Sequence, residues 1–304
     1  MSISGEKIKS KAKESGFDFC GIAKVEPLDE YRKFYTEFIN NKRHCSFSYL
    51  ETNLEKRLDP RKIMTDARSV ITVLLNYYPD NIIPEENNFI ISKYAYGRDY
   101  HPIMKKTDDL IGFMKQECGD IKAQAFVDSG QVLEKVWAQR CGVGWQGKNT
   151  LLINKTAGSF FFIGIILTNL ELQPDDPETD HCGSCDKCIE ACPTGAIDQP
   201  YRLDISRCIS FRTIESKEPV PEELKGKFRD RIYGCDICQD ICPFNKFAKP
   251  ATEPAFRAPE ILTRMKKKDW MKLTEEQFSG LFHDTAISRT GYRQFMNNIR
   301  FVAG

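Results

Sequence analysis

The chain has 304 residues, of which 41% are hydrophobic and 29% charged, and its formal net charge is +1. This length is sufficient for two globular domains with their own hydrophobic cores, so the fold does not need disulfides for stability. The near-neutral charge excludes attraction of nucleic acid by the field of the whole molecule, which leaves a local basic patch as the alternative.

The N-terminal residues 1–24 contain lysines but neither the apolar core nor the cleavage site of a signal peptide. The most apolar run lies at residues 159–170, and it is far shorter than the roughly 20 residues of a membrane-spanning helix. We therefore expect a cytoplasmic protein with no membrane contact, and we interpret residues 159–170 as a buried strand.

Helical and strand patterns alternate in the first part of the chain. The spacing of apolar residues predicts helices at residues 6–14, 103–116 and 131–141 and strands at 69–77 and 123–128. This alternation predicts a layered α/β or α+β domain over residues 1–172. The acidic, proline-containing stretch 173–180 is typical of a solvated linker. We place a cysteine-rich domain at residues 173–250 and a basic helical tail at 251–304.

Two features of the first domain suggest a ligand site. Asp128 follows an apolar strand and precedes Ser129 and Gly130, a position that presents a carboxylate at the end of a strand; an ordinary helix N-cap is the alternative. The glycine-rich segment 142–149 is expected to form a flexible polar loop able to cradle a ligand, although it lacks the context of a P-loop or dinucleotide motif.

Eight of the twelve cysteines lie between positions 182 and 242, which indicates a metal centre rather than disulfides in a reducing compartment. Residues 182–193 have the spacing C-x2-C-x2-C-x3-C-P of bacterial ferredoxins. Zinc is the competing interpretation, but zinc ligands typically come in separated pairs. The sequence therefore predicts two 4Fe-4S clusters.

The ferredoxin spacing also predicts which thiol serves which cluster, because the fourth cysteine of each run binds the other cluster. We assign the first cluster to Cys182, Cys185, Cys188 and Cys242. The second motif is one ligand short, and Cys208 is the nearest remaining cysteine upstream of it. We therefore assign the second cluster to Cys192, Cys208, Cys235 and Cys238.

Seven motifs occur in an order that resembles the epoxyqueuosine reductase family: NLEKRLDPRKI, YAYGRDYH, VDSGQVLEK, GWQGKNTLL, CGSCDKCIEACPTGAI, RCISF and RIYGCDICQDICPFNK. The resemblance extends over about residues 7–247. It implies an α+β fold, in which a layered cobalamin-binding domain related to reductive dehalogenases is joined to a modified ferredoxin-like domain with two 4Fe-4S clusters. It also implies the ligand scheme given above, including Cys208.

The resemblance further implies site residues. Asp128 matches the proton donor of the family. The positions that match its cobalamin contacts, with Asp128 beside them, are Arg57, Asn149, Leu152, Ile163, Ser210 and Asp236. The motif Asp-x-His-x-x-Gly, whose histidine binds cobalt in other cobalamin proteins, is absent, which agrees with a cofactor that has no protein histidine ligand.

The implied reaction is reduction of epoxyqueuosine to queuosine at the tRNA wobble position by cob(I)alamin, which receives electrons from the clusters. The expected partners are tRNA with epoxyqueuosine in its anticodon loop and an external flavodoxin- or ferredoxin-type donor; we expect a monomer. The chain resembles a short form without the C-terminal helical-repeat extension, so we expect phosphate contacts from Arg229, Arg231, Lys246, Lys249 and residues 264–268.

Two other functions remain open. One is a related cobalamin and iron-sulfur reductase, similar to a dehalogenase, that acts on a small molecule. The other is a non-enzymatic electron carrier. Product analysis on tRNA that carries epoxyqueuosine distinguishes the first alternative, and a test for cobalamin binding distinguishes the second.

Overall fold

A computed structural model describes residues 3–304 of the chain, and its centre is a sheet of four strands. In the order in which they lie side by side, the strands are β1 (Phe19–Lys24), β2 (Ser69–Asn76), β7 (Phe161–Thr168) and β4 (Ala123–Phe126). All neighbouring pairs are antiparallel. The predicted strands at 69–77, 123–128 and 159–170 are confirmed, with ends that differ by at most two residues.

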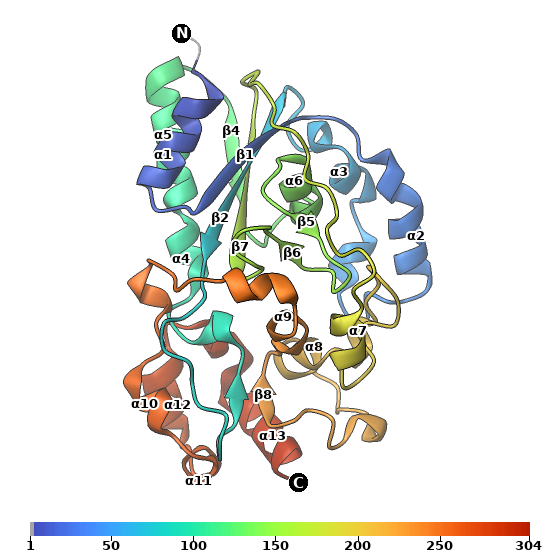
Figure 1. The fold of residues 1–304 in the computed structure, drawn as a ribbon, viewed down its shortest axis with the longest axis vertical. Coiled ribbons are helices and arrows are strands. Elements are labelled where there is room, and N and C mark those ends of the chain that lie inside the picture. The colour runs from blue at the N-terminus through green and yellow to red at the C-terminus, as the bar shows by residue number, and fades with distance from the viewer. Residues whose placement is uncertain (1–2) are drawn as a thin grey trace.

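Helices cover both faces of this sheet (Figure 1). One face carries α1 (Gly5–Glu14), α4 (Tyr100–Met104) and α5 (Lys106–Cys118). The other carries α2 (Arg32–Asn40), α3 (Leu54–Leu58) and α6 (Glu134–Arg140). The three predicted helices are confirmed, except that residues 103–116 are divided between α4 and α5. The predicted layered α+β arrangement is confirmed as well.

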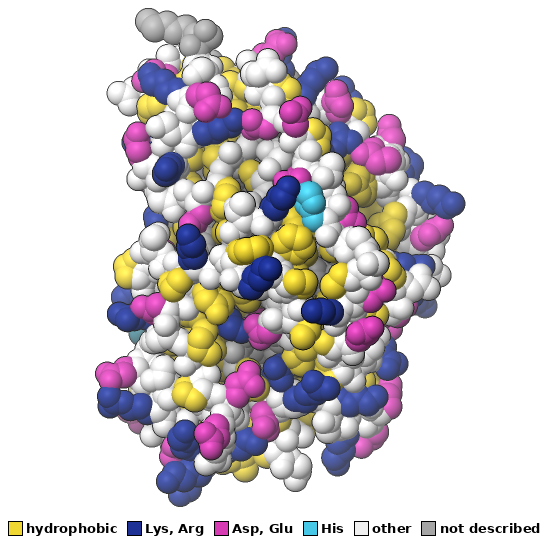
Figure 2. All heavy atoms as spheres, in the orientation of Figure 1, with side chains coloured by type: hydrophobic (Ala, Val, Ile, Leu, Met, Phe, Trp, Pro, Cys, Tyr) yellow, Lys and Arg dark blue, Asp and Glu magenta, His cyan; other side chains and the backbone are white. Residues whose placement is uncertain are grey.

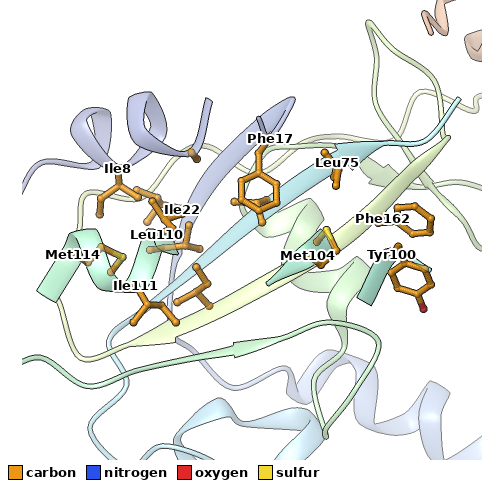
Figure 3. Packing of buried hydrophobic residues seen from close by; sticks show 14 of the residues in the cluster. Ile8, Phe17, Ile22, Leu75, Tyr100, Met104, Leu110, Ile111, Met114 and Phe162 are labelled. Atoms are coloured by element: carbon orange, nitrogen blue, oxygen red, sulfur yellow. The ribbon is translucent and has the colours of Figure 1, made fainter. Parts of the chain in front are cut away.

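Buried residues of β2 alternate between the two faces because successive side chains of a strand point in opposite directions. Ile71 and Val73 pack in the core that contains α1 and α5, whereas Val70 belongs to the core around α6. Figure 3 shows the first core, with Ile8 of α1 and Leu110 of α5 against the sheet. Since both faces of β2 are covered, its sequence is almost continuously apolar.

The stretch 173–180, expected to be solvated, is tied to the edge strand β1. The Asp175 carboxylate accepts a hydrogen bond from the Ile22 N–H at 2.8 Å, and the Asp175 N–H donates to the Ile22 carbonyl at 2.8 Å. Lys9 of α1 forms an ion pair with the same carboxylate. The linker therefore pairs with backbone groups that an edge strand otherwise leaves open.

The cysteine-rich part consists of short elements. Its helices are α7 (Lys187–Ala191), α8 (Ile209–Ile214) and α9 (Ile237–Asp240). Its strand β8 (Arg231–Tyr233) runs parallel to β3 (Ile90–Ile91) of the first part. Figure 1 shows α8 and α9 between the four-stranded sheet and the C-terminal helices. The two parts of the chain are thus joined by strand pairing as well as by the linker.

The C-terminal residues pack as a helical unit on the β3–β8 pair. Its helices are α10 (Glu260–Arg264), α11 (Lys267–Met271), α12 (Glu275–Phe282) and α13 (Gly291–Ala303). Trp270, Phe282 and Phe295 are almost completely buried there, together with Tyr233 of β8. The segment expected as a basic tail is therefore helical and also closes an apolar core that it shares with residues 83–96.

Replacing Trp270 by alanine is expected to lower the free energy of unfolding by about 3–5 kcal/mol, because it leaves a cavity in this core. The change also removes the hydrogen bond from the Trp270 indole N–H to the Asn88 amide oxygen, 2.6 Å long. The shift of the urea unfolding midpoint measures the effect. Ile261→Ala is the control, since Ile261 is 53% exposed and its loss is expected to change stability by less than about 0.5 kcal/mol. Equal midpoints for the two variants would contradict the packing of α11.

The surface carries charges of both signs. Figure 2 shows Lys and Arg side chains mixed with Asp and Glu over the face that it draws, in keeping with the net charge of +1. Within residues 3–304, none of the helices combines the length and the apolar character needed to cross a membrane.

Candidate active site and cluster ligands

A cavity of about 800 Å³ lies beside the C-terminal end of β4 and the start of α6. Three segments bound it, residues 30–57, 128–150 and 180–205. The exposed surface of its wall is mainly apolar, although about half of the lining residues are polar or charged. The apolar and aromatic residues include Phe34, Phe38, Tyr49, Leu50, Val132, Leu133, Leu203 and Ile205. A mainly apolar cavity of this size with a few polar groups is typical of a site for an organic ligand.

Asp128 lies in the wall of this cavity, two residues after β4 ends. Its backbone has a φ of 48°, in the left-handed region that residues other than glycine rarely adopt. Two contacts hold it there: the Asp128 N–H donates to Glu134 Oε1 at 2.7 Å, and the Asp128 Oδ2 accepts from the Tyr100 hydroxyl at 2.7 Å. Because the N-cap of α6 is Leu133, the alternative of Asp128 as a helix cap is wrong.

Tyr100 is itself firmly placed. Its ring stacks on Phe162 of β7 at 4.1 Å between centroids and on His101 at 4.2 Å, and Figure 3 shows it next to Phe162. His101 in turn contacts Asp99 through Nδ1, 2.7 Å from Oδ1. Burial raises the pKa of Tyr100 above its ordinary value, and the charge of Asp128 adds to the rise. Tyr100 is therefore a neutral hydrogen-bond donor to the Asp128 carboxylate.

Four of the eight clustered cysteines are neighbours in the first group. Burial raises the pKa of the Cys188 thiol to about 11, with the charges of Cys182 and Cys242 as further causes. Burial also raises the pKa of Cys242, to which the charges of Cys182 and Cys185 contribute. Helices α7 and α9 contact each other and bring the two motifs together. These are the four thiols predicted for the first cluster.

The other four cysteines form the second group. Burial raises the pKa of Cys238 well above its ordinary value, and the charges of Cys235, Cys208 and Cys192 add to the rise. The pKa of the Cys208 thiol is raised by burial and by the charge of Cys192. Thus Cys208 lies beside the thiols with which the spacing grouped it, although 26 residues separate it from Cys235 in the chain. Within residues 3–304, no three His, Cys, Asp or Glu side chains converge closely enough to hold a metal ion.

Comparisons with known proteins match both parts of the chain. Residues 57–129 match the family described as "Epoxyqueuosine reductase QueG, DUF1730", and residues 181–245 match the "4Fe-4S double cluster binding domain". The epoxyqueuosine reductase of Cellulophaga algicola is 45% identical, over 97% of this chain and 96% of that protein. The Escherichia coli enzyme is 35% identical, over 98% of this chain and 80% of its own length. The chain belongs to the epoxyqueuosine reductase family.

Solved structures agree with this membership. An epoxyqueuosine reductase bound to a tRNA-Tyr stem loop modified with epoxyqueuosine has a TM-score of 0.89 at 29% identity, over 98% of this chain and 80% of that one. The Bacillus subtilis enzyme, in a structure whose catalytic aspartate loop is swung out of the active site, has a TM-score of 0.86 at 29% identity and the same coverage. The predicted family and the fold of a sheet domain joined to a double-cluster module are confirmed.

Of the other positions predicted to contact cobalamin, the cavity wall includes Arg57. Arg57 is buried, and its guanidinium donates a hydrogen bond to the Tyr49 carbonyl at 2.9 Å. The remaining five positions lie outside the wall. Leu152 on β6 (Leu152–Ile153) and Ile163 on β7 pack in a small apolar core that also contains Leu74 and Val143. Their assignment as cofactor contacts stays a prediction.

Asn149, Ser210 and Asp236 surround the second group of cysteines. The Asn149 amide donates to the Cys238 carbonyl at 3.3 Å. Ser210 follows Cys208 in the first turn of α8. The Asp236 carboxylate is buried and accepts hydrogen bonds from the Ser92 hydroxyl and, at 2.8 Å, from the Lys93 N–H. It is therefore engaged by the segment that follows β3.

The glycine-rich segment 142–149 differs from the expectation of a flexible polar loop. It forms a hairpin of β5 (Trp145–Gln146) with β6 and is largely buried. The Trp145 indole N–H donates to the Cys182 sulfur at 3.4 Å, and Lys148 pairs with Asp186 at 2.8 Å. The expectation was wrong because tertiary packing against the cysteine motif covers this segment. The hairpin thus connects the cavity with both groups of cysteines.

Three residues of the site were not predicted: Tyr100, Glu134 and Lys135. Burial raises the pKa of Glu134 to about 8, and the charge of Asp128 adds to the rise. Burial lowers the pKa of Lys135, whose ammonium donates to the Thr150 carbonyl at 2.9 Å. All three lie within motifs that carried the family resemblance, YAYGRDYH and VDSGQVLEK. The adjacent Glu and Lys after VDSG were the signal that could have identified two of them.

Proposed function

We propose that this chain reduces epoxyqueuosine in tRNA to queuosine. The observation that carries the proposal is the position of Asp128 in the wall of a cavity, in which Lys135 of the same wall lies close to Cys238 of the second group of cysteines. The reaction takes up two electrons and two protons, breaks both C–O bonds of the epoxide, and releases the oxygen as water. A proton donor, an electron supply and an organic cofactor site are the parts that this balance requires.

The residues of the cavity wall fit cobalamin. A corrin ring has broad apolar faces, which suit the aromatic part of the wall, and a fringe of amides, which suits polar groups such as Arg57, Gln139 and Gln146. When bound there, cobalamin would supply a strongly reducing cobalt centre. Arg57, held by the Tyr49 carbonyl, and the backbone of the 146–150 hairpin are the groups we assign to its binding.

We assign the remaining steps to this chain's own residues. Asp128, in its protonated form, gives a proton to the oxygen that leaves the epoxide, and the Tyr100 hydroxyl keeps its carboxyl group oriented. The two groups of four thiols hold the 4Fe-4S clusters. Both groups of thiols adjoin the cavity wall. Asp180 of the wall accepts a hydrogen bond from the Cys182 N–H, and Asn149, which contacts Cys238, precedes the wall residue Thr150. Electrons from an external donor of the flavodoxin or ferredoxin type would enter through the first cluster.

The tRNA would approach at the rim of the cavity, since the wobble nucleotide must leave the loop to reach the site. A polar hollow of about 430 Å³, which includes Lys42, adjoins the cavity, and Arg43 and Arg202 line both. We propose that this rim contacts RNA phosphates. Of the candidates chosen from the sequence, Arg231 is buried and donates to the Arg229 carbonyl. Because the substrate is a tRNA, we place the activity in the cytoplasm, and we propose a monomer.

The double variant Lys42→Ala/Arg202→Ala is expected to weaken binding of an epoxyqueuosine tRNA stem loop and to make it less sensitive to salt. Each phosphate contact on a single strand contributes about −0.7 to the slope of log K against log salt. Loss of both contacts is therefore expected to make this slope less steep by about 1.4. Dissociation constants over a range of salt concentrations measure this. Lys268→Ala is the matched control from the C-terminal unit, because Lys268 is exposed on α11. A loss of slope in the control but not in the double variant would assign tRNA binding to that unit instead.

The proposed activity is tested by anaerobic reconstitution with iron, sulfide and cobalamin, followed by reduction and mass spectrometry of the nucleosides from epoxyqueuosine tRNA. Conversion to queuosine is the expected result. A reconstituted protein that binds cobalamin but leaves the tRNA unchanged would favour a reductase of small molecules. A protein that binds clusters and no cobalamin would favour an electron carrier.

A further inference from the structure

A second carboxyl group lies next to Asp128. Glu134 is the first residue of α6, lines the same cavity, and accepts the Asp128 N–H with Oε1 at 2.7 Å. Asp128 is exposed, whereas Glu134 is half-buried. A carboxyl group that binds the backbone of the proposed proton donor and faces the same cavity is well placed to act with it.

The proton balance of the reaction requires a second proton donor besides Asp128. Two protons are consumed in each turnover, and one carboxyl group supplies one proton. After Asp128 has protonated the oxygen, it is a carboxylate and must receive a proton before it can act again. Tyr100 is unsuited to this task because its pKa is raised above the ordinary value of a phenol, whereas the pKa of Glu134 is about 8, so Glu134 is much the stronger acid. The protonated neighbour is the better source.

We propose that Glu134 stores the second proton of the reaction and passes it to Asp128, while it also holds the backbone of Asp128 in place. This inference rests on the proposed function. In the balanced step, both C–O bonds of the epoxide break and the oxygen leaves as water with one proton from Asp128 and one from Glu134 through Asp128. The two electrons come from the external one-electron donor through the clusters. Solvent then returns both protons.

The groups around Glu134 support its neutral form at pH 7. Burial and the charge of Asp128 both raise its pKa, and the charge of Lys135 opposes them. Burial also lowers the pKa of Lys135, which favours its neutral form and so weakens its lowering effect on the pKa of Glu134. Across the cavity, Tyr49 lies near both carboxyl groups and near Arg57, whose guanidinium is 5.8 Å from the Tyr49 ring centroid. With a pKa of about 8, Glu134 keeps its proton at neutral pH and loses it in mildly alkaline solution.

The holding role explains how a strained backbone is maintained. A left-handed conformation at an aspartate persists where surrounding contacts favour it. The hydrogen bond from the Asp128 N–H to Glu134 is one of the two contacts that hold Asp128 in this conformation. The related Bacillus subtilis structure has its catalytic aspartate loop swung out, so a loop of this kind adopts more than one position in that enzyme. An anchor at the backbone N–H would favour the inward position.

The decisive variant is Glu134→Gln in the reconstituted holoenzyme. Glutamine keeps an oxygen that accepts the Asp128 N–H but carries no acidic proton. We expect single-turnover queuosine formation to fall at least about tenfold, as for loss of a proton-transfer group, with unchanged affinity for the tRNA. The wild-type rate is expected to fall above about pH 8, and this alkaline limb is expected to disappear in Glu134→Gln. Glu134→Ala, which loses the anchor too, is expected to be slower still.

A second measurement needs no turnover and so separates this inference from the proposed function. Infrared difference spectra of the protein are expected to contain a protonated carboxyl band that is lost with a midpoint near pH 8 and is absent from Glu134→Gln. Glu86→Gln is the control, because Glu86 is exposed on a loop. Wild-type rates and an unchanged alkaline limb in Glu134→Gln, or a spectrum equal to that of the wild type, would overturn the proposal.

Discussion

Replacing Asp128 by asparagine is expected to lower the rate of queuosine formation by at least about 100-fold, the lower end of the contribution of general acids. Asparagine has nearly the same shape and keeps an oxygen that accepts the Tyr100 hydroxyl, so the loop stays in place, but it has no proton to give. Single-turnover reactions with reduced holoenzyme, analysed by mass spectrometry of nucleosides, measure the rate. Absorbance spectra establish that clusters and cobalamin remain bound.

Asp120→Asn is the matched control for this variant. Asp120 is exposed in the turn before β4, so the same chemical change there is expected to leave the rate unchanged. Tyr100→Phe is expected to give an intermediate loss, because it removes the hydrogen bond to the carboxylate and keeps the stacking on Phe162. A fully loaded Asp128→Asn enzyme with the activity of the wild type would exclude Asp128 as the proton donor.

Replacing Cys208 by alanine is expected to remove one cluster and to abolish turnover. A chain with two 4Fe-4S clusters holds about eight iron atoms, and loss of the second cluster leaves about four. Because Cys238 of the same group lies close to the wall residue Lys135, we expect that electrons would no longer reach the cofactor site. Iron and sulfide analysis after anaerobic reconstitution measures the content, and electron paramagnetic resonance distinguishes which cluster remains.

The control for this variant is Cys118→Ala. Cys118 ends α5, far from the cysteine motifs in the chain, and is expected to retain about eight iron atoms. If Cys208→Ala also retained the full iron content, another group would have to be the fourth ligand of the second cluster. The same result would remove the physical reason for the neighbourhood of Cys208 with Cys192 and Cys238.

The elements that the sequence predicted well are those with a local signal. Strand β2 and helix α1 are encoded by apolar periodicity within a single window, and the structure places both within one residue of the expected ends. The grouping proposed for seven of the eight thiols rests in the same way on fixed spacings, because a cluster imposes the distances between its own ligands, and this assignment stays a prediction. Cys208, separated from its motif by an insertion, was assigned by counting ligands, and its role as a cluster ligand stays a prediction.

The prediction failed where burial depends on distant segments. The glycine-rich residues 142–149 are polar and small in composition, which indicates a loop, yet the cysteine motif packs on them and makes a buried hairpin. The C-terminal residues 251–304 have basic character, but Trp270 and Phe295 close a core with residues 83–96. Neither contact has a periodic signal, because its partners lie 37 residues apart in the first case and 182 residues apart in the second.

The sequence by itself determined the family and the layered sheet, and it supplied the proposed sets of thiols and the proposed donor Asp128, because each depends mainly on motifs that are short in sequence. Only the tertiary structure decided what surrounds Asp128. Tyr100 reaches its carboxylate from α4 across the end of the sheet, and Glu134 binds its backbone from the first turn of α6. These two contacts, and the burial that raises the pKa of Glu134, depend on how the layers pack, so they cannot be predicted from a local pattern of residues.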